Sequence, residues 1–174
     1  PGIAESFSVT PRHAQWVLTA YLVMIALGQL FFGPISDRYG RRLPLFTGLA
    51  LYLVGSIFSF CAPNLEVLVF ARCIQGLGAS AAMVLPRLMI NDPHSPRAAV
   101  ASLAAVTAAM ALTPMISFPF GGLLFEFVGW RGSMAITVLM GLCTMIPSVF
   151  LLHETNMFPQ QYLGLSVVIS SYIS

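Results

Sequence analysis

The sequence predicts an all-α fold, a polytopic membrane helix bundle, and three observations support this prediction. Of the 174 residues, 57% are apolar and only 8% are charged, whereas about a quarter of the residues of a typical soluble domain are charged. The apolar residues form five long runs, and nearly all charged residues lie between these runs. Because so few charges cannot cover the surface of a soluble protein, we expect the chain to lie in a lipid bilayer.

Each apolar run is long enough to cross a bilayer as a helix, since about 20 residues at a rise of 1.5 Å span ~30 Å of hydrocarbon. The five predicted spans cover residues 16–35, 43–62, 65–90, 98–125 and 132–152. Helices are favoured because they satisfy their own backbone hydrogen bonds in lipid, and because barrel strands are shorter and alternate in polarity. The predicted connections between the spans are short, and they cover residues 37–42, 63–66, 92–97 and 126–131. Because they are short, we expect neighbouring spans to be antiparallel.

Arginine is the only basic residue type besides histidine, and its distribution predicts the topology. The net charge of +2 gives no footprint for nucleic acid. One side of the predicted bundle carries five arginines: Arg38, Arg41, Arg42, Arg87 and Arg97. The other side carries Arg12 and Arg131. The positive-inside rule therefore places the first group in the cytoplasm and residues 1–13 outside, so we expect a further helix to precede this segment.

Cysteine, histidine and catalytic patterns give no support for an enzyme, a metal site or a cofactor. Three cysteines lie within apolar runs and are interpreted as small packing residues: Cys61, Cys73 and Cys143. Three histidines lie near the ends of runs, where solvated interfacial side chains are favoured over proton relays: His13, His94 and His153. Residues 76–81 fit the pattern G-x-G-x-x-A, but a dinucleotide site needs a preceding strand that is not predicted here.

The first predicted cytoplasmic turn, residues 33–42, is the most informative stretch. Gly40 permits a tight reversal with positive φ, and Arg41 and Arg42 are predicted to anchor the next helix at the anionic inner leaflet. Asp37 lies at the C-terminal end of its own helix, where the helix dipole disfavours an acid. We therefore expect Asp37 to pair with arginines or with the N-terminus of another helix. The alternative is a solvated loop whose arginines serve only topology.

A charge and an amide, Arg72 and Gln75, interrupt the third apolar run. Arg72 lies seven residues after Leu65, so it either lies within the membrane or extends its side chain outward to the interface. A central arginine costs about 2.5–3.5 kcal/mol in insertion experiments, which favours a functional role. Small residues nearby predict the close approach of another helix: Gly76, Gly78, Ala79, Ala81 and Ala82.

The fourth run contains Pro114 and Pro119, followed by Gly121 and Gly122. Each proline lacks an N–H, so we expect a kink and a bend point for gating. The alternative is ordinary packing, because proline and glycine are common in membrane spans. No span contains an unmistakably buried carboxylate, so a proton-carrying acid is expected at an interface or outside this chain.

Three stretches between residue 1 and about residue 155 together resemble the major facilitator superfamily, particularly drug/proton antiporters of the Bcr/CflA (bicyclomycin-resistance) type. Residues 28–42, GQLFFGPISDRYGRR, look like motif A, and residues 72–79, RCIQGLGA, look like motif B. Residues 114–122 are similar to the antiporter motif C, with Thr113 in place of the usual glycine before the proline. Residues 152–155, LHET, resemble the end of the sixth helix.

The resemblance implies that residues 1–155 form an N-terminal transmembrane half-bundle that contains helices two to six, with helix one missing. Residues 156–174 are then a central loop or the start of a further segment. The implied conformational gate of motif A comprises Gly33, Asp37, Arg38, Gly40, Arg41 and Arg42. The implied coupling and cavity residues of motif B are Arg72, Gln75, Gly76 and Gly78. The implied kink and packing residues of helix five are Pro114, Pro119, Gly121 and Gly122.

The activity implied by the resemblance is proton-coupled efflux of drugs or small amphipathic molecules by alternating access, in the bacterial inner membrane. The expected partners are a small-molecule substrate, protons, the lipid bilayer and the C-terminal half of the same transporter. Two alternatives stay open at this point. One is uptake of a metabolite by the same fold, and the other is a non-transporting membrane protein that has kept the fold.

Overall fold

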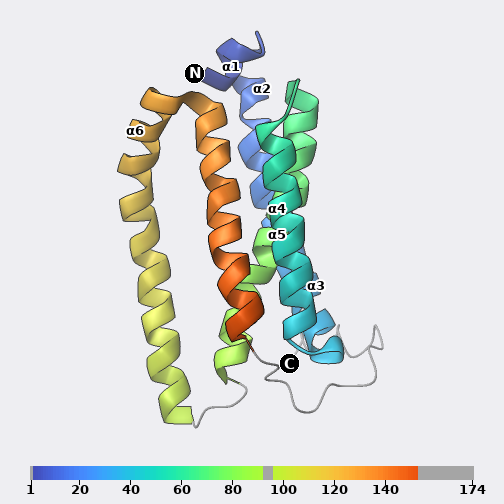
Figure 1. Ribbon diagram of the computed structural model, residues 1–174, viewed down its shortest axis with the longest axis vertical. Helices are drawn as coiled ribbons and strands as arrows, with labels where there is room; N and C mark the ends of the chain where they lie inside the picture. Colours follow the sequence, from blue (N-terminus) through green and yellow to red (C-terminus); the bar gives the residue numbers. More distant parts are fainter. Residues whose placement is uncertain (1, 92–95, 153–174) are drawn as a thin grey trace.

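The computed structural model describes residues 2–91 and 96–152, which form a bundle of helices (Figure 1). The helices are α1 (Gly2–Ser6), α2 (Pro11–Ala14), α3 (Trp16–Tyr39), α4 (Arg42–Phe60), α5 (Leu65–Asn91) and α6 (Pro96–Leu151). Five helical stretches of the described residues are long and apolar enough to cross a membrane: Pro11–Tyr39, Arg42–Phe60, Leu65–Ile90, Val100–Leu123 and Phe125–Leu151. The predicted fold class is confirmed.

The helix α3 is longer than predicted, and the stretch from Gly33 to Arg42 is mostly helical rather than a turn. The helix continues past Pro34 and ends at Tyr39, so Asp37 lies in its last turn. Gly40 then adopts φ 85° and ψ 169°, a conformation that an L-residue with a Cβ rarely takes. The predicted positive φ at Gly40 is confirmed, and this one residue ends the helix.

The predicted loop at residues 126–131 is also shorter than expected. Within α6, the only described residue with non-helical backbone angles is Gly129, at φ 67° and ψ −174°. Gly129 reverses the chain at one end of the bundle, so α6 consists of two arms that lie side by side (Figure 1). The sequence correctly placed a reversal here, but it did not reveal that one glycine is sufficient.

The helix α5 forms the centre of the bundle because its small residues let two neighbours approach closely. It packs most extensively against α3 and α4. A Cβ added at Gly76 would collide with the backbone of Tyr21 in α3, and one at Gly78 would collide with the backbone of Tyr52 in α4. The predicted small-residue surface of α5 is therefore confirmed, and it serves both neighbouring helices.

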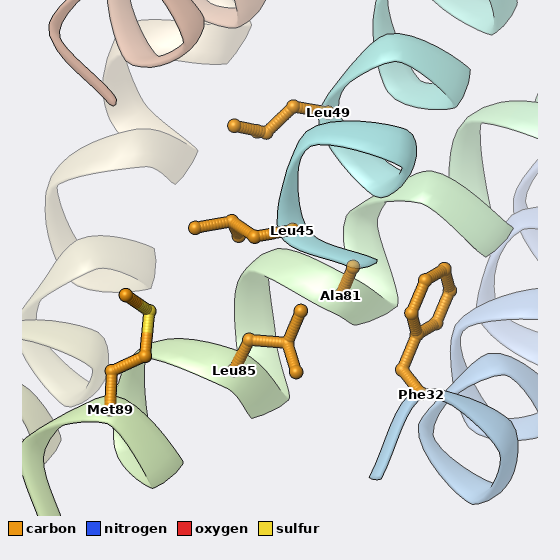
Figure 2. Packing of buried hydrophobic residues seen from close by; sticks show 6 residues of the cluster. All are labelled: Phe32, Leu45, Leu49, Ala81, Leu85 and Met89. Carbon is orange, nitrogen blue, oxygen red and sulfur yellow. The ribbon is translucent and has the colours of Figure 1, made fainter. Parts of the chain in front are cut away.

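Two apolar clusters stabilise opposite ends of the bundle. At the end that contains the α3–α4 connection, side chains from α3, α4 and α5 converge, as Figure 2 shows: Phe32, Leu45, Leu49, Ala81, Leu85 and Met89. At the other end, the second arm of α6 packs against α3, the start of α5 and the segment between α4 and α5 through a second cluster: Val17, Ala62, Leu68, Trp130 and Met134. These clusters hold α3, α5 and the second arm of α6 in fixed relative positions.

Candidate functional site

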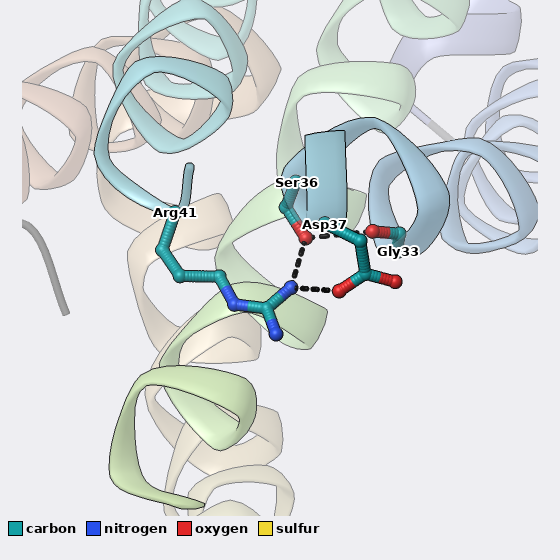
Figure 3. A network of polar contacts seen from close by, with 4 residues as sticks. All are labelled: Gly33, Ser36, Asp37 and Arg41. Carbon is teal, nitrogen blue, oxygen red and sulfur yellow. Dashed lines mark hydrogen bonds and ion pairs between the residues drawn. The ribbon is translucent and has the colours of Figure 1, made fainter. Parts of the chain in front are cut away.

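The first group of polar contacts lies where α3 meets α4, and it contains the predicted partners of Asp37 (Figure 3). Arg41 Nη1 donates to Asp37 Oδ1 at 2.5 Å and to Ser36 Oγ at 2.7 Å. Ser36 Oγ in turn donates to the carbonyl of Gly33 at 2.7 Å. The expectation that Asp37 pairs with an arginine is confirmed. This pairing also offsets the unfavourable position of the acid at the C-terminal end of α3.

Arg41 and Arg42 are adjacent in sequence but lie in different environments. Arg41 is only 7% exposed and points toward Ser36 and Asp37, so the prediction that it anchors α4 at the lipid surface is wrong. Arg42 is exposed, lies over the ring of Phe46 and donates to the carbonyl of Val149 at 3.3 Å. The positive φ at Gly40 explains the difference, because it turns the chain so that the following residue folds back onto α3.

The second group of polar contacts surrounds Arg72 inside the bundle. Arg72 Nη1 donates to Gln75 Oε1 at 2.9 Å, and Gln75 Nε2 donates to Ser56 Oγ of α4 at 2.8 Å. Ser56 Oγ in turn donates a hydrogen bond to the carbonyl of Tyr52 at 2.7 Å. Both Gln75 and Ser56 are fully buried. Arg72 is therefore held inside the bundle rather than extended to the interface.

Two further elements contact the Arg72 guanidinium from other directions. From α6, Met134 accepts a hydrogen bond from Nη2, with a sulfur to nitrogen distance of 3.2 Å. From α3, Tyr21 places its ring 5.4 Å from the guanidinium carbon, as in a cation–π contact. Arg72 and Tyr21 also line a cavity of about 260 Å³ with Ile3, Ala14, Val17 and Leu18.

The electrostatic character of this site follows from the type of partner that each donor has. An amide oxygen, a thioether and an aromatic ring all attract a cation, but none carries a negative charge. Within residues 2–91 and 96–152, no carboxylate forms an ion pair with Arg72, and its buried Nε has no hydrogen-bond partner. Arg72 therefore keeps an uncompensated positive charge in this part of the molecule.

The glycines of the two motifs differ in what surrounds them. In motif B, Gly76 and Gly78 lie against neighbouring backbone, as described above. In the first arm of α6, by contrast, nothing lies within 4 Å of a Cβ added at Gly121 or Gly122. The described helices therefore do not use the predicted packing surface of helix five, and tight packing there stays a prediction.

The structure does not test the predicted gate at the prolines of the first arm of α6. The backbone at Pro114 and Pro119 stays helical, and no described side chain between Val100 and Leu123 is buried. Gating by a bend at these prolines remains a prediction.

Two further residues of motif A have these surroundings. Gly33 has open space around the position that a Cβ would take. Arg38 lies over the ring of Tyr39, with its guanidinium carbon 5.1 Å from the ring centroid.

Sequence reasoning missed several residues that complete these two groups. Ser36 and Ser56 are small polar residues in apolar runs, and Tyr21 is a polar aromatic residue in one, so their polarity was an available signal. Met134 gave no signal, because methionine is a normal component of an apolar helix. Outside these two groups, the contacts of Trp130 were also missed: its indole N–H donates to Ser6 Oγ at 3.0 Å, and its ring centroid lies 5.3 Å from that of Phe7.

Some predictions fall on residues that lie outside the described part of the chain. These are the connection at residues 92–95 with His94, the side chain of Arg97, the motif end at His153–Thr155, and the segment at residues 156–174. Their roles stay predictions. Within the described part, no group of three or more histidine, cysteine or acidic residues could hold a metal ion.

The fold and the two polar groups define the class of this protein. Five long apolar helical stretches, close packing of α5 through small residues and an arginine held inside the bundle are typical of a multi-pass integral membrane protein. Comparison with protein families gives the particular class. Residues 1–163 match the Major Facilitator Superfamily, and the chain belongs to this family.

Similar proteins agree with this family assignment. The chain is 34% identical over 157 residues to an uncharacterized MFS-type transporter, YdgK, of Bacillus subtilis, with 89% of the chain and 39% of the relative covered. It is 35% identical over 143 residues to a chloramphenicol resistance protein of Pseudomonas aeruginosa, with 82% and 33% covered. A putative multidrug resistance protein, MdtD, of Escherichia coli is 26% identical over 162 residues, with 93% and 34% covered. The chain spans about two fifths or less of the length of these relatives.

Proposed function

We propose that residues 1–155 form the N-terminal half-bundle of a transporter that exports drugs or other small amphipathic molecules in exchange for protons. The transporter is of the Bcr/CflA type, lies in a bacterial inner membrane and works by alternating access with a C-terminal half. Membership of the Major Facilitator Superfamily supports transport. The names of two relatives, a chloramphenicol resistance protein and a putative multidrug resistance protein, support export of drugs.

The observation that carries the proposal is the environment of Arg72. A positive charge without a carboxylate partner is costly inside a membrane protein, and such residues mark ion or substrate pathways. Arg72 is fixed by Gln75 and Met134 beside a cavity of about 260 Å³. Its field favours the ionised form of any nearby acid and the departure of its proton. That bias is what a proton-coupled transporter needs when it changes between its two closed states.

The group around Asp37 and Arg41 supports a second part of the mechanism. Its contacts fix the connection between α3 and α4 at the end of the bundle that the positive-inside rule places in the cytoplasm. Asp37 is half-exposed, with 48% of its side-chain surface accessible. We propose that this exposed edge, with Arg38 and Arg42, contacts a helix of the C-terminal half when the cytoplasmic side closes.

The central experiment measures drug accumulation in cells that lack other efflux pumps and produce the full-length transporter that contains this sequence. We expect chloramphenicol or a fluorescent amphipathic compound to accumulate less than in cells with an empty vector, and a protonophore to abolish the difference. Increased accumulation would instead establish uptake. Unchanged accumulation of every compound tested would favour a non-transporting protein.

The variant Arg72→Gln tests the observation on which the proposal rests. We expect it to reduce efflux by about tenfold or more, the usual consequence of removing one interaction of a buried charge. The matched control is Arg87→Gln, because Arg87 is exposed and donates only to the thioether of Met110 among the described residues. Equal effects of the two substitutions would contradict the proposed role of Arg72.

A further measurement tests the dependence on a second half. Residues 1–174 reconstituted alone into proteoliposomes are expected not to transport, because a site at the interface of two half-bundles is incomplete when one is absent. The control is the full-length transporter in the same vesicles. Substrate accumulation driven by a pH gradient in vesicles that hold only residues 1–174 would refute this expectation.

A further inference from the structure

The contact between Met134 and Arg72 lies beside the apolar cluster in which the second arm of α6 meets the start of α5. The second arm of α6 packs mainly against α4, and its contacts with α5 are fewer. Met134 is only 5% exposed and places its sulfur 3.2 Å from Arg72 Nη2, across 62 residues of sequence. A thioether sulfur can accept a hydrogen bond, so Met134 both fills space in the apolar cluster and offers an acceptor to Nη2.

Both terminal nitrogens of the Arg72 guanidinium donate hydrogen bonds. Nη1 is fixed by Gln75 on the same helix, Nη2 is fixed by Met134 on α6, and the ring of Tyr21 on α3 lies against the group. Because the guanidinium is planar and its donors point in fixed directions, two contacts at opposite ends fix its rotation. Without the contact from α6, the group could pivot about the Gln75 hydrogen bond.

We propose that Met134 is a positioning residue for Arg72, acting as a neutral hydrogen-bond acceptor for Nη2. A carboxylate at this place would also fix the group, but it would cancel the charge. The thioether fixes the group and leaves the charge uncompensated. This inference rests on the proposed function of Arg72 in transport, because it specifies how that arginine is oriented.

The test compares two substitutions that separate accepting a hydrogen bond from filling space. In the full-length transporter, Met134→Leu keeps a similar volume but removes the acceptor, and Met134→Gln keeps an acceptor of similar length. If Met134 acts through its sulfur, Met134→Leu reduces the maximal rate of efflux about fivefold, as expected for the loss of one ordinary hydrogen bond to a weak acceptor. Met134→Gln then restores the rate to near that of the wild type. A packing role predicts the opposite order, because cores tolerate leucine for methionine better than a polar side chain.

A double-mutant cycle adds a second, independent readout. If Met134 acts through Arg72, Met134→Leu has no further effect on efflux or thermal stability when Arg72→Gln is already present. An undiminished effect in that background would overturn the proposal, as would a Met134→Gln protein that fails to fold. The matched control is Met145, which packs against the apolar cluster at the other end. There, leucine is expected to be tolerated and glutamine to be harmful.

The thermal stability arm separates this inference from the proposed function. If the wild-type protein does not transport, the proposed function fails, but the order of melting temperatures still decides the role of Met134. A melting temperature for Met134→Gln above that for Met134→Leu supports the acceptor role. The reverse order overturns it, whether or not the protein transports.

Discussion

Two arginines of this bundle, Arg41 and Arg72, are held by hydrogen bonds to partners of different charge. Each donates hydrogen bonds to two side chains: Arg41 to Ser36 and Asp37, and Arg72 to Gln75 and Met134. Arg41 has a carboxylate partner, Asp37, at 2.5 Å. The partners of Arg72 in the described part of the chain are an amide, a thioether and an aromatic ring, all of them neutral.

The difference indicates what each arginine can do. A guanidinium paired with a carboxylate forms a nearly neutral unit, which can join two helix ends but has little effect on a distant charge. A guanidinium with neutral partners is also fixed in place, but its full charge acts on any acid or substrate that comes near. We therefore propose a structural role for the Arg41–Asp37 pair itself, beside the proposed contact of its exposed edge with the C-terminal half, and an electrostatic role for Arg72.

The largest effect is expected from Gln75→Glu, which gives Arg72 the type of partner that Arg41 has. The new carboxylate would replace the amide oxygen that lies 2.9 Å from Nη1. We expect efflux to fall about 100-fold. The reason is that an ion pair of about 3 kcal/mol between the introduced carboxylate and Arg72 would neutralise the positive charge that the proposed mechanism uses. The protein should still fold, since neither ion is unpaired. The control is Gln15→Glu at the exposed start of α3. Wild-type efflux by Gln75→Glu would show that the uncompensated charge is not required.

The turn that brings Arg41 back onto α3 is expected to be the next most sensitive point. Gly40→Ala places a Cβ at φ 85° and ψ 169°, which costs about 1–3 kcal/mol of stability. Gly33→Ala is the matched control, because it lies in helical backbone with open space around it, and it should be neutral or slightly stabilising. Thermal unfolding in detergent measures both. Equal melting temperatures would show that the backbone at residue 40 adjusts without cost.

The carboxylate of the first group is expected to have a smaller effect than the turn. Asp37→Asn keeps an acceptor but removes the charge that faces Arg41, and the acid is 48% exposed. We expect a loss of about 1–2 kcal/mol, less than for a fully buried pair, because water compensates part of the change. Glu66→Gln is the control, since Glu66 is exposed and forms no ion pair among the described residues. A loss of the same size for Glu66→Gln would remove the distinction between the two acids.

Sequence reasoning predicted the features that depend on local composition. Apolar runs predicted all five helical stretches, and the glycine at position 40 predicted the reversal with positive φ. The pairing of Asp37 could be predicted because an acid at a helix C-terminus needs a positive partner. The small residues around Gly76 predicted close helix contacts, because only their side chains allow them.

The remaining features depend on which residues meet across the bundle, and the sequence does not specify this. The prediction that Arg41 lies at the lipid surface was wrong because a basic residue at a helix start usually faces headgroups, whereas here the turn directs it inward. Met134 is 62 residues from Arg72 and looks like any other core residue. Only the packing of α6 brings its sulfur to the guanidinium.

The smallest expected effect separates Ser56 from Ser59, two fully buried serines of α4. Ser56 Oγ accepts from Gln75 at 2.8 Å and thereby supports the neutral contacts of Arg72, whereas Ser59 Oγ has no partner in the described part of the chain. Ser56→Ala should cost about 1 kcal/mol of stability, because it leaves a buried amide donor unpaired. Ser59→Ala should be neutral or slightly stabilising, since it removes an unpaired hydroxyl from an apolar environment. Thermal unfolding of both variants measures the difference, and equal losses would mean that Gln75 is held without the help of α4.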